Sequence, residues 1–80
     1  MPKAFVLLNT EVSSEEEVIA ALNKFDEVVS THVVYGVYDI IAEVEAETFE
    51  LLKDGVLESI RTLENIRSTV TMIVAKELYL

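Results

Sequence analysis

The sequence predicts an α+β fold of the ferredoxin-like βαββαβ type, a four-stranded antiparallel sheet with both helices on one face. Two observations predict it. Stretches rich in β-branched residues and stretches with helical spacing of apolar residues follow in the order strand, helix, strand, strand, helix, strand. The chain has 80 residues, the length of one small domain, so a single domain is expected to span residues 1–80.

The first half of the chain supplies a strand and a helix. Lys3–Asn9 is an unbroken apolar run of a length typical of a buried strand. Ser14 and Glu17 form a capping-box pattern that predicts a helix start, and the neighbouring acidic residues suit the positive end of a helix dipole. An apolar stripe is predicted to bind this helix to the sheet: Val18, Ile19, Leu22 and Phe25.

A hairpin and a second helix follow. Val28–Tyr35 and Val37–Ala46 are both strand-like, and Gly36 between them predicts a tight turn. The second helix is predicted to start at Glu47, and Gly55 inside it is unfavourable unless packing or a distortion justifies it. The predicted apolar side of this helix consists of Phe49, Leu52, Val56, Ile60 and Leu63.

The sheet face without helices needs another cover. Ile66–Lys76 is predicted to be the last strand, and the first strand is apolar on both sides, which marks an interaction site. For identical chains the economical solution is a two-fold dimer whose sheets face each other. Alternation along the strands places Asp39, Thr69 and Thr71 at or near that interface and Tyr38 on the helix-covered side. The tail Glu77–Leu80 carries apolar side chains suited to docking on a neighbouring chain.

Composition excludes several kinds of function. The absence of cysteine removes disulfides, thiolate nucleophiles and sulfur-ligated metal centres. A single histidine, His32, offers at most one imidazole ligand per chain, so no metal and no cofactor are expected, and a packed or interface role suits it better. The formal net charge of −9 repels a phosphate backbone, which argues against direct nucleic-acid binding. No apolar run reaches the ~20 residues that cross a bilayer, and no secretory signal begins the chain, so no membrane contact and a cytoplasmic location are expected.

One acidic residue near the hairpin turn is a candidate ligand-binding group. The ammonium group of an amino acid can be bound by a carboxylate such as Asp39, and its carboxylate by backbone N–H groups or by the hydroxyls of Thr69 and Thr71. The alternative is that Asp39 accepts backbone hydrogen bonds and caps the turn, while the threonines merely suit a half-buried strand. The residue pattern leaves both interpretations open.

Two short motifs resemble the ligand-binding (RAM) domain of the Lrp/AsnC, or feast/famine, transcription regulators. Tyr35–Asp39 is similar to the Gly-x-Tyr-Asp turn of that family, and Ser68–Thr71, followed by Met72–Val74, resembles its last strand. The resemblance covers essentially the whole chain. It implies a site for a small-molecule effector, typically an amino acid, at Gly36, Val37, Tyr38 and Asp39, with Ser68, Thr69 and Thr71 as further candidates.

The same resemblance implies an assembly. Domains of this family pair through their sheets, the dimers form larger rings, and effectors bind between dimers. We expect no counterpart of the family's helix-turn-helix domain, because the sequence begins directly in its first strand. We therefore expect a stand-alone binding and oligomerisation module that is not an enzyme and that can co-assemble with full-length regulators of the family. The alternative is a small dimeric ferredoxin-like enzyme, a cofactor-free isomerase or monooxygenase, for which His32 is the only favourable feature.

Overall fold

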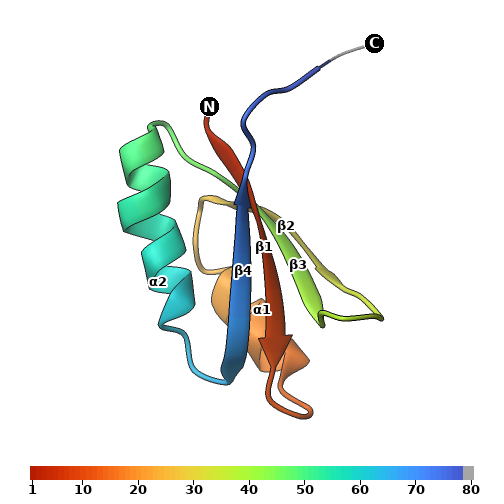
Figure 1. Cartoon of the computed structure of the whole chain (residues 1–80). Coiled ribbons are helices and arrows are strands. Elements are labelled where there is room, and N and C mark those ends of the chain that lie inside the picture. Colours follow the sequence, from red (N-terminus) through yellow and green to blue (C-terminus); the bar gives the residue numbers. More distant parts are fainter. Residues whose placement is uncertain (79–80) are drawn as a thin grey trace.

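The computed structural model describes residues 1–78 and has the predicted order of elements (Figure 1). Its antiparallel sheet has the strand order β2-β3-β1-β4, with both helices on one side, which confirms the ferredoxin-like α+β fold. The elements are β1 (Lys3–Thr10), α1 (Glu15–Leu22), β2 (Val28–Val33), β3 (Ile40–Glu45), a helix in two parts, η1 (Leu51–Leu57) and α2 (Glu58–Arg61), and β4 (Ile66–Ile73). Among the described residues, no helix is both long enough and apolar enough to cross a membrane.

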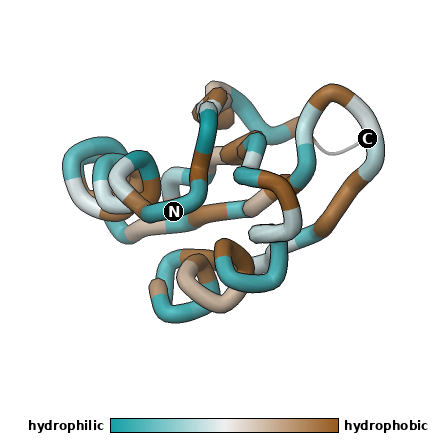
Figure 2. Tube along the Cα trace, turned by 90° about the horizontal axis from the view of Figure 1, so that it is seen from below, coloured by the Kyte–Doolittle hydropathy of each residue, from teal (hydrophilic) through white to brown (hydrophobic). Residues whose placement is uncertain are grey.

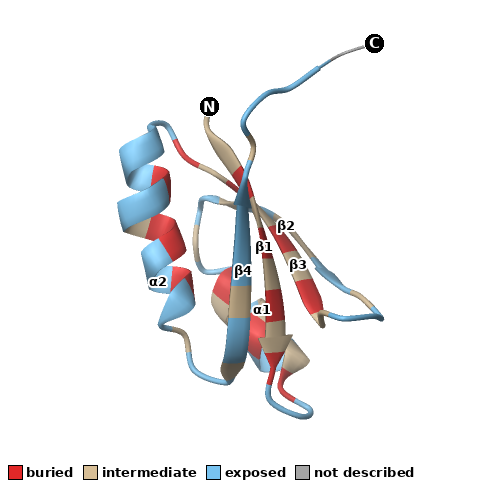
Figure 3. Cartoon of the chain, in the orientation of Figure 1, coloured by how far each residue is buried: buried red, intermediate tan, exposed pale blue. Residues whose placement is uncertain are grey.

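The hydrophobic core lies between the helices and one face of the sheet. Side chains alternate between this core and the other face along β1 and β3, as strands require, and the buried sides of η1 and α2 face the strands (Figure 3). Hydrophobic and hydrophilic residues alternate along the trace of helices and strands alike (Figure 2). Each large core side chain contributes roughly 1.5–3 kcal/mol by leaving water. The largest fully buried ones are Leu8, Leu22, Ile40, Leu52, Ile60, Val6, Val18 and Val44.

The capping box predicted for α1 does not form. Ser14 precedes the helix, but its side chain makes no capping hydrogen bond within the described chain. Glu17 instead accepts a hydrogen bond from Asn65 Nδ2 at 3.0 Å, and the backbone N–H of Glu11 donates to the Asn65 carbonyl oxygen at 2.9 Å. Asn65 has a left-handed φ of 67° at the loop before β4. A tertiary contact between α1 and the loop before β4 has therefore replaced the local cap.

The second helix starts and turns differently from the prediction. Thr48 Oγ1 accepts a hydrogen bond from the Leu51 N–H at 3.0 Å and caps the first turn. The first part of the helix, η1, has the wider i→i+5 turns of a π-helix, which change the positions that face the sheet. Leu57 consequently joins Leu52 in the core. The prediction that Phe49 faces the core is wrong, because its side chain is 52% exposed.

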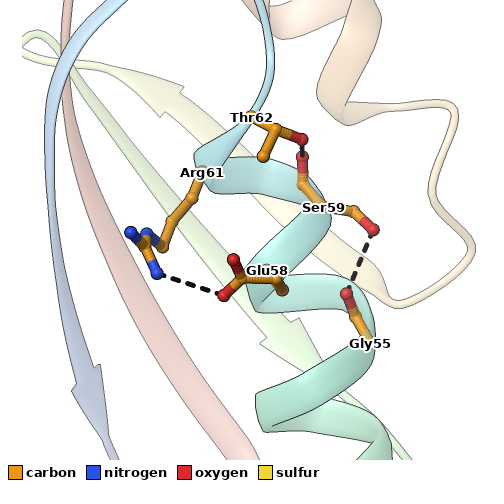
Figure 4. Close-up of polar contacts among 5 residues, drawn as sticks. All are labelled: Gly55, Glu58, Ser59, Arg61 and Thr62. Carbon is orange, nitrogen blue, oxygen red and sulfur yellow. Dashed lines mark hydrogen bonds and ion pairs between the residues drawn. The ribbon is translucent and has the colours of Figure 1, made fainter.

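The π-helical turns provide the distortion expected around Gly55. A Cβ atom at this helical position would meet no atom within 4 Å among residues 1–78, and the Gly55 carbonyl oxygen accepts a hydrogen bond from Ser59 Oγ at 3.1 Å (Figure 4). Gly55→Ala is expected to raise the free energy of unfolding by about 0.5–1 kcal/mol, since alanine lowers the entropy of the unfolded chain. Urea denaturation measures the difference, and a less stable variant would show that these turns require glycine.

The hairpin connection is longer than predicted. β2 ends at Val33 and β3 begins at Ile40, so Val34–Asp39 is a loop rather than a tight turn between two long strands. The Val34 N–H donates to the Asp39 carbonyl oxygen at 2.9 Å and closes this loop. Gly36 has a φ of 144°, a conformation that side chains disfavour. The predicted boundaries were too long because β-branched residues continue into the loop.

The C-terminal end of the sheet also differs from the prediction. β4 ends at Ile73, short of the predicted Lys76, and the chain then leaves the sheet and points away from the body of the domain (Figure 1). Leu78 is exposed there. Of the tail predicted to dock on a neighbouring chain, Tyr79 and Leu80 lie outside the described residues.

Candidate functional site

A polar pocket of about 440 Å³ lies where the hairpin loop meets the end of β1 and the start of β4. Its volume is in the range of small-molecule sites. We refer to it as the polar pocket, and its lining residues are Asn9, Thr10, Val37, Asp39, Arg67 and Ser68. Three of the predicted site residues, Val37, Asp39 and Ser68, are therefore brought together, although Ser68 lies far from the other two in the sequence.

Asp39 anchors the hairpin loop to the end of β1. Its Oδ2 accepts hydrogen bonds from the Thr10 backbone N–H at 2.9 Å and from Thr10 Oγ1 at 3.4 Å, in partly buried surroundings. Its own backbone N–H donates to the Leu8 carbonyl oxygen at 2.9 Å. Asp39 thus accepts a backbone hydrogen bond, as one of the two interpretations proposed. The donor is Thr10 at the end of β1, however, and not a residue of the turn that contains Asp39.

A β-bulge explains how two consecutive residues of β4 reach the polar pocket. Asn9 lies opposite Ser68, whereas Thr10 lies opposite Ile66, so Arg67 has no directly opposite residue in β1. In a regular strand consecutive side chains point to opposite faces, and a bulge removes that constraint. Arg67 and Ser68 therefore line the same pocket. Asn9 Nδ2 donates to Ser68 Oγ at 3.3 Å and joins the two strands there.

Sequence reasoning missed Asn9, Thr10 and Arg67. A charged residue beside Ser68 in the sequence was the available signal for Arg67. Its use would have required the position of the bulge, which depends on the pairing of two strands almost sixty residues apart. Of the other predicted residues in the hairpin loop, neither Gly36 nor Tyr38 lines the polar pocket within the described chain.

Thr69 and Thr71 lie on the helix side of the sheet. In the register of β1 and β4, Thr69 is opposite Leu8 and Thr71 is opposite Val6, and directly opposite residues share a face. Leu8 and Val6 are buried beneath the helices. The prediction that the two threonines lie at the open face is therefore wrong. Alternation shows which residues share a face, but a strand with apolar residues on both sides does not reveal which face the helices cover.

The open face of the sheet carries an apolar row. Leu7 pairs with Ile41 on one side and Val70 on the other, and Phe5 pairs with Met72. Val70 and Met72 are 41% and 50% exposed, which matches the expectation of a face that another molecule can cover.

Charged residues border this apolar row. Lys3 Nζ lies 3.6 Å from Glu43, 3.7 Å from Glu45 and 3.2 Å from Glu77. The hydrogen bond to Glu77, with the charges of all three carboxylates, raises the pKa of Lys3 above its ordinary value of 10.5. The rim of the open face is thus acidic, with one lysine bound among three glutamates.

His32 lies on the open face as well, because it is directly opposite Ile41. Its side chain is exposed, and it does not line the polar pocket in the described part of the chain. No group of three or more histidine, cysteine, aspartate or glutamate residues among residues 1–78 is placed to hold a metal ion.

Comparison with known proteins identifies the family. Residues 3–80 match the model of the Lrp/AsnC ligand binding domain. The chain belongs to this family. The resemblance based on the hairpin and last-strand motifs is thereby confirmed.

Three relatives illustrate what this Lrp/AsnC domain is similar to. It is 31% identical over 70 residues to the uncharacterized HTH-type transcriptional regulator PH0140 of Pyrococcus horikoshii, and the match covers 88% of this chain but 44% of the relative. The crystal structure of the hypothetical protein PHS023, also from Pyrococcus horikoshii, is 40% identical with a TM-score of 0.86, and 96% and 93% of the two chains are covered. The L-Met complex of the transcriptional regulator NMB0573 from Neisseria meningitidis shares the fold, with 18% identity, a TM-score of 0.83 and coverage of 99% and 53%.

These relatives define a coarse role for the Lrp/AsnC domain. Its family is a family of ligand-binding domains, which points to ligand binding, and its curated relatives are named transcriptional regulators. The chain spans less than half the length of the first of these regulators, so the match concerns only their ligand-binding part.

Proposed function

We propose that this Lrp/AsnC domain binds an amino acid in the polar pocket. The observation that carries the proposal is that Val37, Asp39 and Ser68 line one pocket. The two family motifs implied these residues as site residues before their positions in the fold were known. Gly36 and Tyr38 belong to the proposed site through the loop that they share with Asp39. Thr69 and Thr71 are left out of it, because their side of the sheet faces the helices.

The chemistry of the lining suits an amino acid. The polar pocket offers a carboxylate, an amide, hydroxyls and a guanidinium, and these groups complement an ammonium and a carboxylate. The related regulator from Neisseria meningitidis is a complex with L-Met, which makes L-methionine a reasonable first probe for this chain.

The proposal includes an assembly. Two copies can cover the apolar rows of their open faces by two-fold pairing, and dimers can associate further into a ring in which neighbouring chains close the mouths of the polar pockets. Full-length regulators of the family contain the same kind of domain, so mixed assemblies with such partners are part of the proposal. Tyr35 and Val37, which are 104% and 82% exposed at the hairpin tip, are available for contacts between dimers.

Calorimetric titration with each of the twenty amino acids tests the binding proposal. We expect one or a few of them to bind, and Ser68→Ala to weaken that binding by about 1 kcal/mol, roughly fivefold, through the loss of one hydrogen bond. Ser59→Ala is the matched control, because Ser59 is an exposed serine on α2 outside the polar pocket. The absence of binding by every amino acid would contradict the proposal.

A further inference from the structure

Arg67 brings a free positive charge to the polar pocket. It is exposed, and a β-bulge places it beside Ser68 on the pocket wall. Within residues 1–78, the ion pairs involve Lys3 and Arg61, so the Arg67 guanidinium is not neutralised by a carboxylate of the described chain. Bulges beside binding sites commonly redirect a side chain, and this bulge has that effect on Arg67.

Asp39 supplies the opposite charge in the same pocket. Its Oδ2 is engaged by Thr10, but a carboxylate has two oxygens and about four acceptor positions. No hydrogen bond from the described residues reaches its Oδ1. Asp39 and Arg67 line one pocket without forming an ion pair with each other in the described chain, so each can bind a ligand group of opposite charge.

The charge of the whole chain decides which ligands suit this pair. A guanidinium binds carboxylates and phosphates well. A ligand with a net negative charge would be repelled both by Asp39 and by a chain of formal charge −9. A zwitterion without net charge avoids this repulsion and places one group on each of the two residues.

We infer that Arg67 binds the α-carboxylate of a zwitterionic amino acid while Asp39 binds its ammonium group. Arg67 is then the residue that makes the domain require a free carboxylate on its ligand. This inference rests on the proposed amino-acid function. It goes further than that function, because it assigns the two ends of the ligand and excludes amines and amidated amino acids.

The test compares each amino acid that binds with its carboxamide, which lacks the negative charge, for example L-methionine with L-methioninamide. Calorimetry is expected to show that the wild-type chain binds the carboxamide about tenfold to a hundredfold more weakly. Arg67→Gln is expected to weaken binding of the free amino acid by a similar factor and to bind both compounds alike. Arg67→Lys keeps the charge but loses the planar fork of the guanidinium. Its affinity for the free amino acid should therefore lie between those of the wild type and of Arg67→Gln.

Arg61→Gln is the matched control, because Arg61 is an exposed arginine that pairs with Glu58 on α2 at 3.1 Å (Figure 4). This variant should discriminate between the two compounds as the wild type does. Equal wild-type affinity for both compounds, or unchanged amino-acid binding by Arg67→Gln, would overturn the role of Arg67 and leave the proposed function standing. If no amino acid binds the wild-type chain, both proposals fail.

Discussion

Asp39→Ala is expected to abolish amino-acid binding and also to destabilise the domain, whereas Asp39→Asn should abolish binding alone. Alanine removes the partly buried acceptor of the Thr10 N–H, and a lost hydrogen bond to a charged group costs about 1–3 kcal/mol. That is a large share of the roughly 5–15 kcal/mol by which small domains are stable. Asparagine retains an oxygen that can accept from Thr10 but carries no charge for an ammonium group.

The two effects are separated by two measurements. Urea denaturation at one fixed protein concentration gives the stability of each variant, since the midpoint of an oligomer depends on concentration. Calorimetry with the amino acids that bind the wild type gives the affinity. Asp26→Ala, at an exposed aspartate between α1 and β2, should change neither quantity. Wild-type affinity in Asp39→Asn would show that the charge of Asp39 does not bind the ligand.

Leu7→Glu is expected to convert the proposed dimer into a folded monomer. Leu7 is central in the apolar row, between Ile41 and Val70, and Glu43 already carries negative charge on the same face. If two open faces pair, the new carboxylate becomes buried without a cationic partner in each chain, which costs about 3–5 kcal/mol. The dimer dissociation constant should therefore rise more than about a hundredfold.

Sedimentation equilibrium measures the association, and circular dichroism shows whether the dissociated chain remains folded. The matched control is Leu51→Glu, because Leu51 is a 56% exposed leucine on η1 and lies outside the open face. It should leave the association unchanged. A Leu7→Glu variant that stays dimeric would show that the chains pair through another surface.

Local patterns predicted the elements and much of the core. Helical spacing identified Val18 and Leu22 as buried residues of α1, and strict alternation identified Ile40, Ala42 and Val44 as the buried side of β3. These predictions succeed because the spacing of apolar residues follows directly from helix and strand geometry. The capping-box prediction failed because it considered local partners alone. Glu17 accepts a hydrogen bond from Asn65, which is distant in the sequence.

The sequence by itself determined the order of elements, the ferredoxin-like fold, the family motifs and the value of Asp39 as a candidate. Only the tertiary structure decided which face Thr69 and Thr71 occupy, that Thr10 is the partner of Asp39, and that Arg67 belongs to the pocket. The physical reason lies in strand pairing. The alternation of side chains along a strand is the same whichever of its two faces meets the helices, so it does not determine that face. The bulge at Asn9 and Thr10 depends on how β1 and β4 align across the sheet.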